Sequence, residues 1–242
     1  MHYQWDFHFL LHYTPLFWKG ILVTLAYTAG TIFLGLILGL LIGLGRLARA
    51  NFGTLSAIQV KFWLVSTAFW VFPLQWCLIA FVEAFRCTPL LVQIVWVYYA
   101  LPVLLGVQIP ATVAAIVTLS CYTGAFYAEI FRGGIVSIER GQWDAARALG
   151  LRSWALMRRV ILPQAIRRMI PPFVNQSITQ LKNTSLVSTI AVPDLLYNGS
   201  LITADTYRPL EVYTVVAVIY FVLLFPSTML AQWYERRLQT DR

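Results

Sequence analysis

The chain has 242 residues, of which 59% are hydrophobic and only 12% are charged. Soluble domains carry roughly a quarter of charged residues, so this composition excludes an ordinary soluble protein and indicates a protein of the lipid bilayer. Apolar runs of about 20 residues recur, whereas long alternating strand patterns do not, so we expect an all-α, polytopic membrane helical bundle. The formal charge of +8 does not indicate nucleic-acid binding, because most basic residues lie in loops between apolar runs.

Four apolar runs are long enough to cross a membrane, and a fifth candidate is hydrophobic overall but rich in amides and hydroxyls. The apolar runs are residues 20–44, 88–105, 111–131 and 212–233, and the polar one is residues 172–192. We expect residues 1–242 to form a single transmembrane domain. Cys77, Cys87 and Cys121 are isolated and form no C-x-x-C motif, so we expect neither a metal site nor a disulfide.

Three glycines in the first run, Gly35, Gly39 and Gly43, are spaced four residues apart. This small-xxx-small stripe predicts that another helix approaches closely along it. The alternative is a lipid-facing anchor in which the glycines are incidental.

Basic residues predict the orientation, because cytoplasmic loops are enriched in lysine and arginine. Arg46, Arg49 and Lys61 follow the first run, and residues 132–168 contain eight arginines but only two acidic residues. Residues 193–211 carry three acidic side chains and one arginine. We therefore expect five crossings, with the N-terminus outside and the C-terminus, which ends in Arg242, in the cytoplasm.

Residues 62–81 do not fit five crossings, although their hydropathy permits a sixth. A crossing there would reverse every later loop and turn the arginine-rich loop outward. We expect instead an interfacial or re-entrant helix, or a kinked extension of the next span with its break near Pro73.

Two pairs of opposite charges lie three residues apart in or beside the apolar runs. Glu83 and Arg86, followed by Thr88, can pair on one helical face, and Glu129 and Arg132 repeat the spacing. Each charge would cost roughly 2.5 to 3.5 kcal/mol at mid-bilayer, so these groups should face protein or water. For the first pair a solute path and interfacial anchoring remain open, and for Arg132 anchoring is favoured.

The polar run, residues 172–192, is too polar to face lipid on every side. Its polar side chains surround the helix, so we expect it to be buried among other helices. Two roles remain open: its polar groups join helices of the bundle, or they line a route for a polar solute.

A basic stretch interrupts the apolar sequence at residues 140–168. Alanines and Arg147 predict a short helix over residues 141–149, and Gly150 is a natural C-terminal stop. Small side chains make this helix thin, so it suits a groove on another protein; a solvated basic loop is the alternative. The small residues are Gly141, Ala145, Ala146 and Ala148.

A second short helix is predicted after Gly150. Ser153 is a suitable N-cap, and the helix should end at about Ile161, because Pro163 disfavours the helical conformation at Leu162.

The segment "DAARALGLRSWALMRRVILP" resembles the EAA loop of ABC importer permeases. The family pattern is Glu-Ala-Ala, three residues, Gly, nine residues, Ile, one residue and Leu-Pro. This chain keeps the spacing and departs from the pattern by Asp for Glu and Val for Ile. The matching residues are Asp144, Ala145, Ala146, Gly150, Val160, Leu162 and Pro163.

Further segments between residues 83 and 192 resemble the polar amino-acid branch of that family. They are "FRCTPLLVQIVWVYYALP", "YAEIFRGGIVSIERGQWDAARALG", "ILPQAIRRMIPPFVNQ" and "LKNTSLVSTIAV". Two departures stand out: Cys87 replaces the usual glycine, and residues 58–82 look like an insertion.

The resemblance implies a type I importer permease of the bacterial inner membrane, with residues 140–163 as its coupling loop. It implies as partners a cytoplasmic ABC ATPase dimer that uses ATP and Mg, a second permease subunit (the same or a sister chain), and a periplasmic binding protein that delivers a polar amino acid. The implied coupling residues are Gly141, Asp144, Ala145, Ala146, Gly150, Leu162 and Pro163. The chain has no G-x-x-x-x-G-K-[ST] loop, so we expect no cofactor and no ATPase site of its own.

Polarity alone suggests a hypothetical solute pathway, formed by Glu83, Arg86, Thr88, Glu129, Asn175, Lys182, Asn183 and Ser185. The main alternative to an importer subunit is an ion-driven secondary transporter or channel, which gives no reason for the small, glycine-terminated loop helix. A membrane enzyme is disfavoured, because no metal-ligand cluster or nucleophile–base pair is evident.

Overall fold

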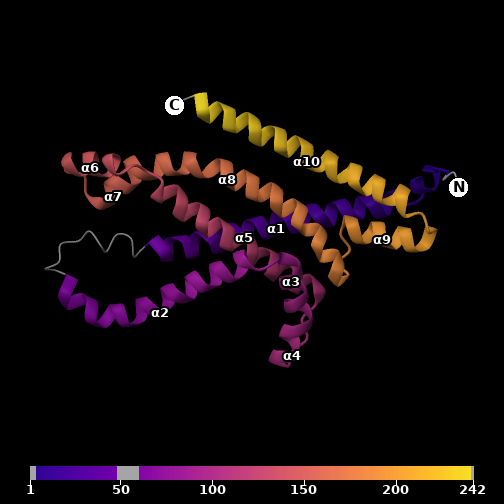
Figure 1. Cartoon of the computed structure of the whole chain (residues 1–242), viewed down its shortest axis with the longest axis horizontal. Coiled ribbons are helices and arrows are strands. Elements are labelled where there is room, and N and C mark those ends of the chain that lie inside the picture. Colours follow the sequence, from indigo (N-terminus) through magenta and orange to yellow (C-terminus); the bar gives the residue numbers. More distant parts are fainter. Residues whose placement is uncertain (1–3, 48–59, 241–242) are drawn as a thin grey trace. The chain divides into compact units, whose positions relative to one another are not determined.

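The computed structural model describes residues 4–47 and 60–240, and all regular structure in these ranges is helical (Figure 1). The prediction of an all-α chain is confirmed. Arg49 and Arg242, two of the orientation signals, lie outside the described residues.

The long helices are α1 (Thr14–Leu47), α2 (Val60–Cys87), α5 (Ala111–Val136), α8 (Leu162–Asn183) and α10 (Pro209–Thr240). The shorter α-helices are α3 (Leu90–Val95), α4 (Leu101–Leu105), α6 (Arg140–Ala148), α7 (Ser153–Leu156) and α9 (Leu195–Thr206). The 3-10 helices are η1 (His8–Leu11) and η5 (Thr184–Ile190), and the π-helical turns are η3 (Trp96–Ala100) and η4 (Met157–Ile161).

The described residues form two compact units. The first comprises residues 4–33, 90–120 and 177–240, and the second comprises residues 34–47, 60–89 and 121–176. The helices α1, α5 and α8 each contribute residues to both units. The grouping of all residues into a single transmembrane domain stays a prediction.

In the second unit, the glycine stripe of α1 packs directly on α5. A Cβ placed on Gly35 would lie 2.8 Å from the Thr123 side chain, and one on Gly39 would lie 2.6 Å from the Tyr127 Cβ. Because real side chains do not come this close, only glycine permits the observed separation of the two backbones. The predicted close approach is confirmed, and the alternative of incidental glycines is wrong.

In the first unit, α9 and α10 pack against the beginning of α1. Phe17, Leu195, Ile202 and Val212 belong to one buried apolar cluster. A Cβ on Gly20 would lie 2.8 Å from the Leu195 Cα, so this glycine also permits close packing. These contacts hold α9 against α1.

Residues 62–81 form part of the single helix α2. Its backbone stays helical through Pro73, so the predicted break at this residue is wrong. Prolines are tolerated within membrane helices, where neighbouring groups replace the lost hydrogen bond. The helix ends instead at Cys87. Pro89 disfavours the helical conformation at the residue before it, Thr88, and this explains the end.

Three helical segments are long and apolar enough to cross a bilayer among the described residues: Thr14–Arg46, Ala111–Val136 and Pro209–Trp233. A fourth candidate is the broken pair Leu74–Cys87 and Leu90–Leu105, taken as one span. The five-crossing topology and the place of residues 62–81 relative to the membrane stay predictions.

The polar run, residues 172–192, begins inside a longer helix. Helix α8 starts at Leu162 and continues through Pro171 and Pro172. It ends at Asn183, and η5 continues the chain to Ile190.

Candidate functional site

The loop after α5 contains a short helix with a sharp end. Helix α6 is followed by Gly150, whose φ of +74° lies in the left-handed region that favours glycine. The Gly150 N–H donates to the Arg147 carbonyl at 2.9 Å, and the Leu151 N–H donates to the Ala146 carbonyl at 3.2 Å. These bonds satisfy carbonyls at the helix end, so the predicted glycine stop is confirmed.

One face of α6 rests on a buried apolar cluster. Ala146 is 3% exposed and belongs to the same cluster as Ile135 of α5 and Ile161 and Ala165 of the α7–α8 segment. The partly buried Trp143 packs against this cluster as well. Helix α6 is therefore seated on the ends of the two helices that flank the loop.

The other face of the loop carries exposed side chains. Asp144 is exposed and pairs with Arg147 across 3.4 Å, while Leu149 is 81% and Trp154 71% exposed. Two large apolar side chains exposed beside a seated helix suit a protein-docking surface. Gly141 and Ala145 are also exposed, so the small residues leave room for a close neighbour.

The end of the loop differs from the prediction. Leu162 has φ −58° and ψ −44°, so it is helical, and the helix continues through Pro163. Ser153 is the first residue of α7, and Arg152 occupies the N-cap position, so the predicted Ser153 cap is also wrong. Because Pro163 has no N–H, it cannot bond the carbonyl four residues earlier, and the π-helical turn η4 directly precedes this point.

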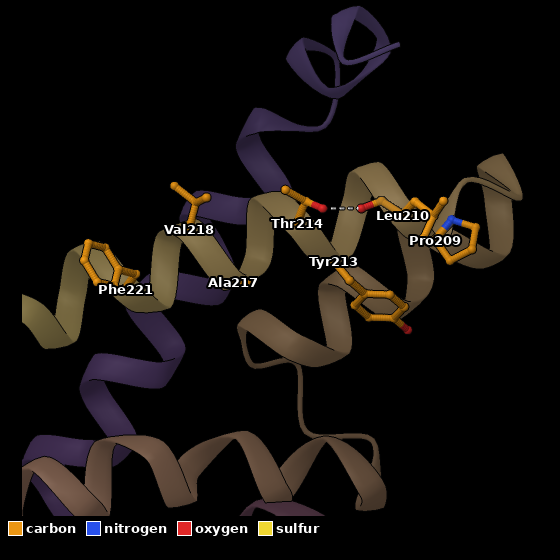
Figure 2. Close-up of a pocket in the computed structure, with 7 residues that line it drawn as sticks. All are labelled: Pro209, Leu210, Tyr213, Thr214, Ala217, Val218 and Phe221. Carbon is orange, nitrogen blue, oxygen red and sulfur yellow. Dashed lines mark hydrogen bonds between the residues drawn. The ribbon is translucent and has the colours of Figure 1, made fainter. Parts of the chain in front are cut away.

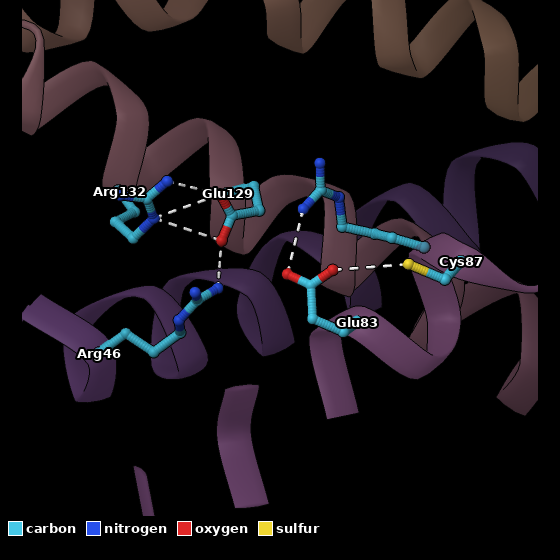
Figure 3. Close-up of polar contacts among 6 residues, drawn as sticks. Arg46, Glu83, Cys87, Glu129 and Arg132 are labelled. Atoms are coloured by element: carbon cyan, nitrogen blue, oxygen red, sulfur yellow. Dashed lines mark hydrogen bonds and ion pairs between the residues drawn. The ribbon is translucent and has the colours of Figure 1, made fainter. Parts of the chain in front are cut away.

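A cluster of charges lies in the second unit (Figure 3). Glu129 of α5 binds Arg132 of the same helix at 2.8 Å and also forms an ion pair with Arg46 of α1. The Arg46 and Glu129 side chains are only 13% and 16% exposed. The predicted pairing of Glu129 with Arg132 is confirmed, and Arg46 is a partner that the sequence analysis used only as an orientation signal.

The second predicted pair lies near the end of α2 (Figure 3). The Arg86 guanidinium is 3.5 Å from the Glu83 carboxylate and lies over the ring of Phe126, 5.8 Å from its centroid. Cys87 donates to Glu83 at 3.6 Å, and the Thr88 hydroxyl donates to the Ala84 carbonyl at 2.6 Å. The predicted pairing of Glu83 with Arg86 is confirmed, and both side chains remain partly exposed.

The remaining residues of the hypothetical pathway are divided between the two units. Asn175 belongs to the second unit, as do Glu83, Arg86 and Glu129, whereas Lys182, Asn183 and Ser185 belong to the first. Asn175 and Lys182 are exposed, and the Ser185 hydroxyl donates to the Lys182 carbonyl at 2.8 Å. The Asn183 amide nitrogen is buried and has no hydrogen-bond partner among the described residues.

Comparison with known proteins shows the family of the chain. The family model described as "Binding-protein-dependent transport system inner membrane component" matches residues 65–240. The chain belongs to this family. The resemblance inferred from the EAA loop is therefore confirmed.

Relatives match this permease over almost its whole length. It is 35% identical to the glutamine transport system permease protein GlnP of Escherichia coli (strain K12) over 237 residues, which are 98% of this chain and 99% of the relative. It is 32% identical to the arginine transport system permease protein ArtQ of Bacillus subtilis (strain 168) over 236 residues, 98% of each chain. A crystal structure of an amino acid ABC transporter with histidines has a TM-score of 0.82 and 34% identity, and covers 97% of this chain and 100% of that chain. The predicted type I permease fold is confirmed.

The permease also buries polar groups that the sequence analysis did not assign to a site. Gln180 of α8 is fully buried and donates to the Thr31 hydroxyl of α1 at 2.9 Å, whereas its carbonyl oxygen has no partner among the described residues. The only sequence signal for this buried group was the polarity of residues 172–192, which did not distinguish Gln180 from its exposed neighbours. This bond supports the role of α8 polar groups in joining helices.

Two acidic residues near α9 are buried as well. Asp194 is the N-cap of α9: its carboxylate accepts the Tyr197 N–H at 2.8 Å and the Tyr220 hydroxyl at 3.4 Å. Burial raises the pKa of the Asp194 carboxyl to about 6. Glu211 is fully buried and accepts the Asp6 N–H at 3.3 Å and the Arg208 guanidinium at 3.2 Å.

A groove of about 580 Å³ runs along one face of α10 (Figure 2). One of its polar groups is bonded within the helix, since the Thr214 hydroxyl donates to the Leu210 carbonyl at 2.6 Å. Val218 and Phe221 are exposed in it, as expected for a membrane helix that faces lipid or another helix. The groove is lined by Pro209, Leu210, Tyr213, Thr214, Ala217, Val218 and Phe221.

Proposed function

We propose that this permease moves a polar amino acid through the bacterial inner membrane, driven by a separate ATPase that docks on residues 140–163. The observation that carries the proposal is the seating of α6. This helix buries Ala146, ends at the left-handed Gly150, and leaves Leu149 and Trp154 exposed beside it. A solvated loop would need neither the buried contact nor the two exposed apolar side chains.

The packing beneath α6 supports a mechanical role for the loop. Ala146 shares one buried cluster with Ile135 of α5 and with Ile161, Ala165 and Met169 around the start of α8. Close-packed clusters transmit displacement rather than absorb it. A partner that moves α6 therefore moves the adjoining ends of α5 and α8, which is how closure of an ATPase dimer would change access to the pathway.

Gly150→Asp tests the docking. A side chain at φ +74° strains the loop by about 1 to 2 kcal/mol and adds a charge at the docking surface. We expect the variant to insert in the membrane but to lose ATP-driven uptake and co-purification of the ATPase. Gly106→Asp is the matched control, because Gly106 has a similar φ of +65° and a Cβ there meets nothing within 4 Å. Normal uptake by Gly150→Asp, or equal loss in both variants, would contradict docking at this loop.

The substrate class is inferred from a glutamine permease and an arginine permease among the relatives, and from the crystal structure of an amino acid ABC transporter with histidines. Within this chain, Arg86 or Lys182 suits a substrate carboxylate, and a carboxylate or amide suits its ammonium group. Arg86→Ala and Asn175→Ala should each lower uptake and substrate-stimulated ATP hydrolysis. Unchanged values in both variants would remove these residues from the pathway.

The partners follow from the same proposal. We expect a periplasmic binding protein to deliver the solute, a second permease subunit to complete the path, and the ATPase rather than this chain to bind ATP and Mg. A nucleotide-binding subunit that co-purifies in mild detergent supports the importer. Its consistent absence, together with uptake driven by an ion gradient, would favour a secondary transporter.

A further inference from the structure

A small basic groove lies on the helical segment that follows α6. It has a volume of about 290 Å³ and is lined by Arg159, Val160, Pro163, Gln164 and Arg167. Arg159, Pro163 and Arg167 are spaced four residues apart, so they follow one another on a single helical face. The Pro163 ring and Val160 thus form an apolar floor between two guanidinium groups.

The two arginines of the groove are not neutralised within the protein. Neither Arg159 nor Arg167 has an ion pair or hydrogen bond among residues 4–47 and 60–240, and both are exposed. Neighbouring arginines differ: Arg147 pairs with Asp144, and Arg168 donates to the Ser137 carbonyl. Two free guanidinium forks over one groove suit a phosphate group, which accepts paired N–H donors.

The shape of the groove is held by a fixed amide. The Gln164 amide nitrogen donates to the Val160 carbonyl at 2.9 Å and to the Gln142 side chain at 3.3 Å. Gln164 thereby connects the groove to α6 and leaves the two arginines as its only charged members. A ligand is therefore recognised by charge and by contact with the apolar floor.

The position of the groove indicates where the phosphate comes from. Ala165 lies between the lining residues Gln164 and Arg167 in sequence and is buried in the same cluster as Ile135, at the end of the candidate span Ala111–Val136. The groove is therefore near the level at which that span leaves the bilayer. Ile166, adjacent to Arg167, is 51% exposed and offers an apolar surface beside the charges. Arginine at such a boundary extends its guanidinium to the headgroup region.

We propose that this groove binds the headgroup phosphate of an anionic phospholipid. The leaflet assignment rests on the proposed orientation, which puts this end of the bundle at the anionic cytoplasmic surface. The lipid would sit beside the loop that connects the bundle to the ATPase, so its occupancy couples the lipid composition of the membrane to transport. An acidic surface of the ATPase is the competing occupant.

Lipid retention by the purified full-length permease tests the proposal. The probe is phosphatidylglycerol, titrated into the detergent-solubilised protein and counted by native mass spectrometry, with phosphatidylcholine and inorganic phosphate as separate arms. The variant Arg159→Gln/Arg167→Gln removes the groove charges. The matched control is Arg152→Gln/Arg158→Gln, which removes two exposed arginines of the same loop that do not line the groove.

We expect phosphatidylglycerol to bind wild type and the control alike and to bind the groove variant about 30-fold more weakly, the effect of removing two basic contacts to an anionic lipid. Equal loss in both double variants, equal binding of phosphatidylcholine, or binding of inorganic phosphate as tight as that of the lipid would overturn the proposal. A groove variant that binds lipid as wild type does but no longer co-purifies with the ATPase would also overturn it, in favour of an acidic surface of the ATPase as the occupant. Because lipid is counted on the permease alone, these outcomes do not depend on whether it is part of an importer.

Discussion

Gly39 of α1 and Tyr127 of α5 approach so closely that a Cβ on residue 39 would lie 2.6 Å from the Tyr127 Cβ and 2.9 Å from the Gly124 carbonyl oxygen. Without a hydrophobic driving force between helices in lipid, such backbone proximity supplies the van der Waals contacts that hold them together. The stripe of Gly35 and Gly39 is therefore a principal helix–helix contact of the second unit.

Replacing the central glycine of this stripe should separate the two helices. Gly39→Ala adds a methyl group that requires α1 or α5 to shift, and overpacking of this kind costs about 1 to 3 kcal/mol. We expect a lower midpoint of thermal unfolding in detergent for Gly39→Ala. Gly30→Ala is the control on the same helix, because a Cβ there meets nothing within 4 Å, and it should be neutral or slightly stabilising. Equal midpoints for the two variants would show that the close contact is not energetically important.

The charged cluster predicts unequal effects at its two largely buried members. Glu129→Gln leaves Arg46 and Arg132 without their carboxylate, and loss of one partner from a mostly buried pair should cost about 3 kcal/mol. Arg46→Gln leaves Glu129 paired with Arg132 and should cost only about 1 kcal/mol. Denaturant unfolding of both variants measures the difference. A larger loss for Arg46→Gln than for Glu129→Gln would contradict the central position of the carboxylate.

Local sequence patterns predicted the contacts that depend on helical periodicity. The spacing of Gly35 and Gly39 indicated a close helix contact, and the spacing of Glu129 and Arg132 indicated an ion pair. Both follow from which residues share one helical face, which is known once a helix is assumed. The third partner, Arg46, is 83 residues away from Glu129, and nothing in the local pattern links them.

Helix ends near prolines were predicted less well. Pro73 and Pro163 were expected to mark a break and a helix end, yet α2 continues through Pro73 and α8 continues through Pro163. A proline removes one backbone hydrogen bond, and packing of buried residues such as Ala165 and Met169 offsets that cost. This balance depends on tertiary contacts, which the local sequence does not contain.

Asp194→Asn should change how stability depends on pH. Burial raises the folded-state pKa of this carboxyl from 3.8 to about 6, so its contribution to stability is fully present below pH 3.8 and is lost as pH rises through about 6. The loss amounts to about 3 kcal/mol at neutral pH. Asparagine keeps an oxygen that can accept the Tyr197 N–H but does not ionise. We expect Asp194→Asn to melt higher than wild type at pH 8 and at a similar temperature near pH 4. A constant difference across this range would show that Asp194 does not titrate in the folded protein.

The exposed apolar residues of the loop should matter for partner binding and not for folding. Leu149 and Trp154 are 81% and 71% exposed, so their truncation removes little buried area from the permease itself. We expect the free energy of unfolding of Leu149→Ala/Trp154→Ala to lie within about 1 kcal/mol of the wild-type value, as is usual for surface changes. ATPase co-purification should nevertheless fall at least tenfold, since truncating one large apolar contact at an interface can cost more than about 1 kcal/mol.

Val103→Ala/Leu104→Ala is the control, because these residues are 82% and 70% exposed and lie in α4, away from residues 140–163 in the sequence. Equal ATPase recovery for the two double variants would exclude Leu149 and Trp154 from the docking surface, whereas an unfolded loop variant would show that these side chains stabilise the permease instead.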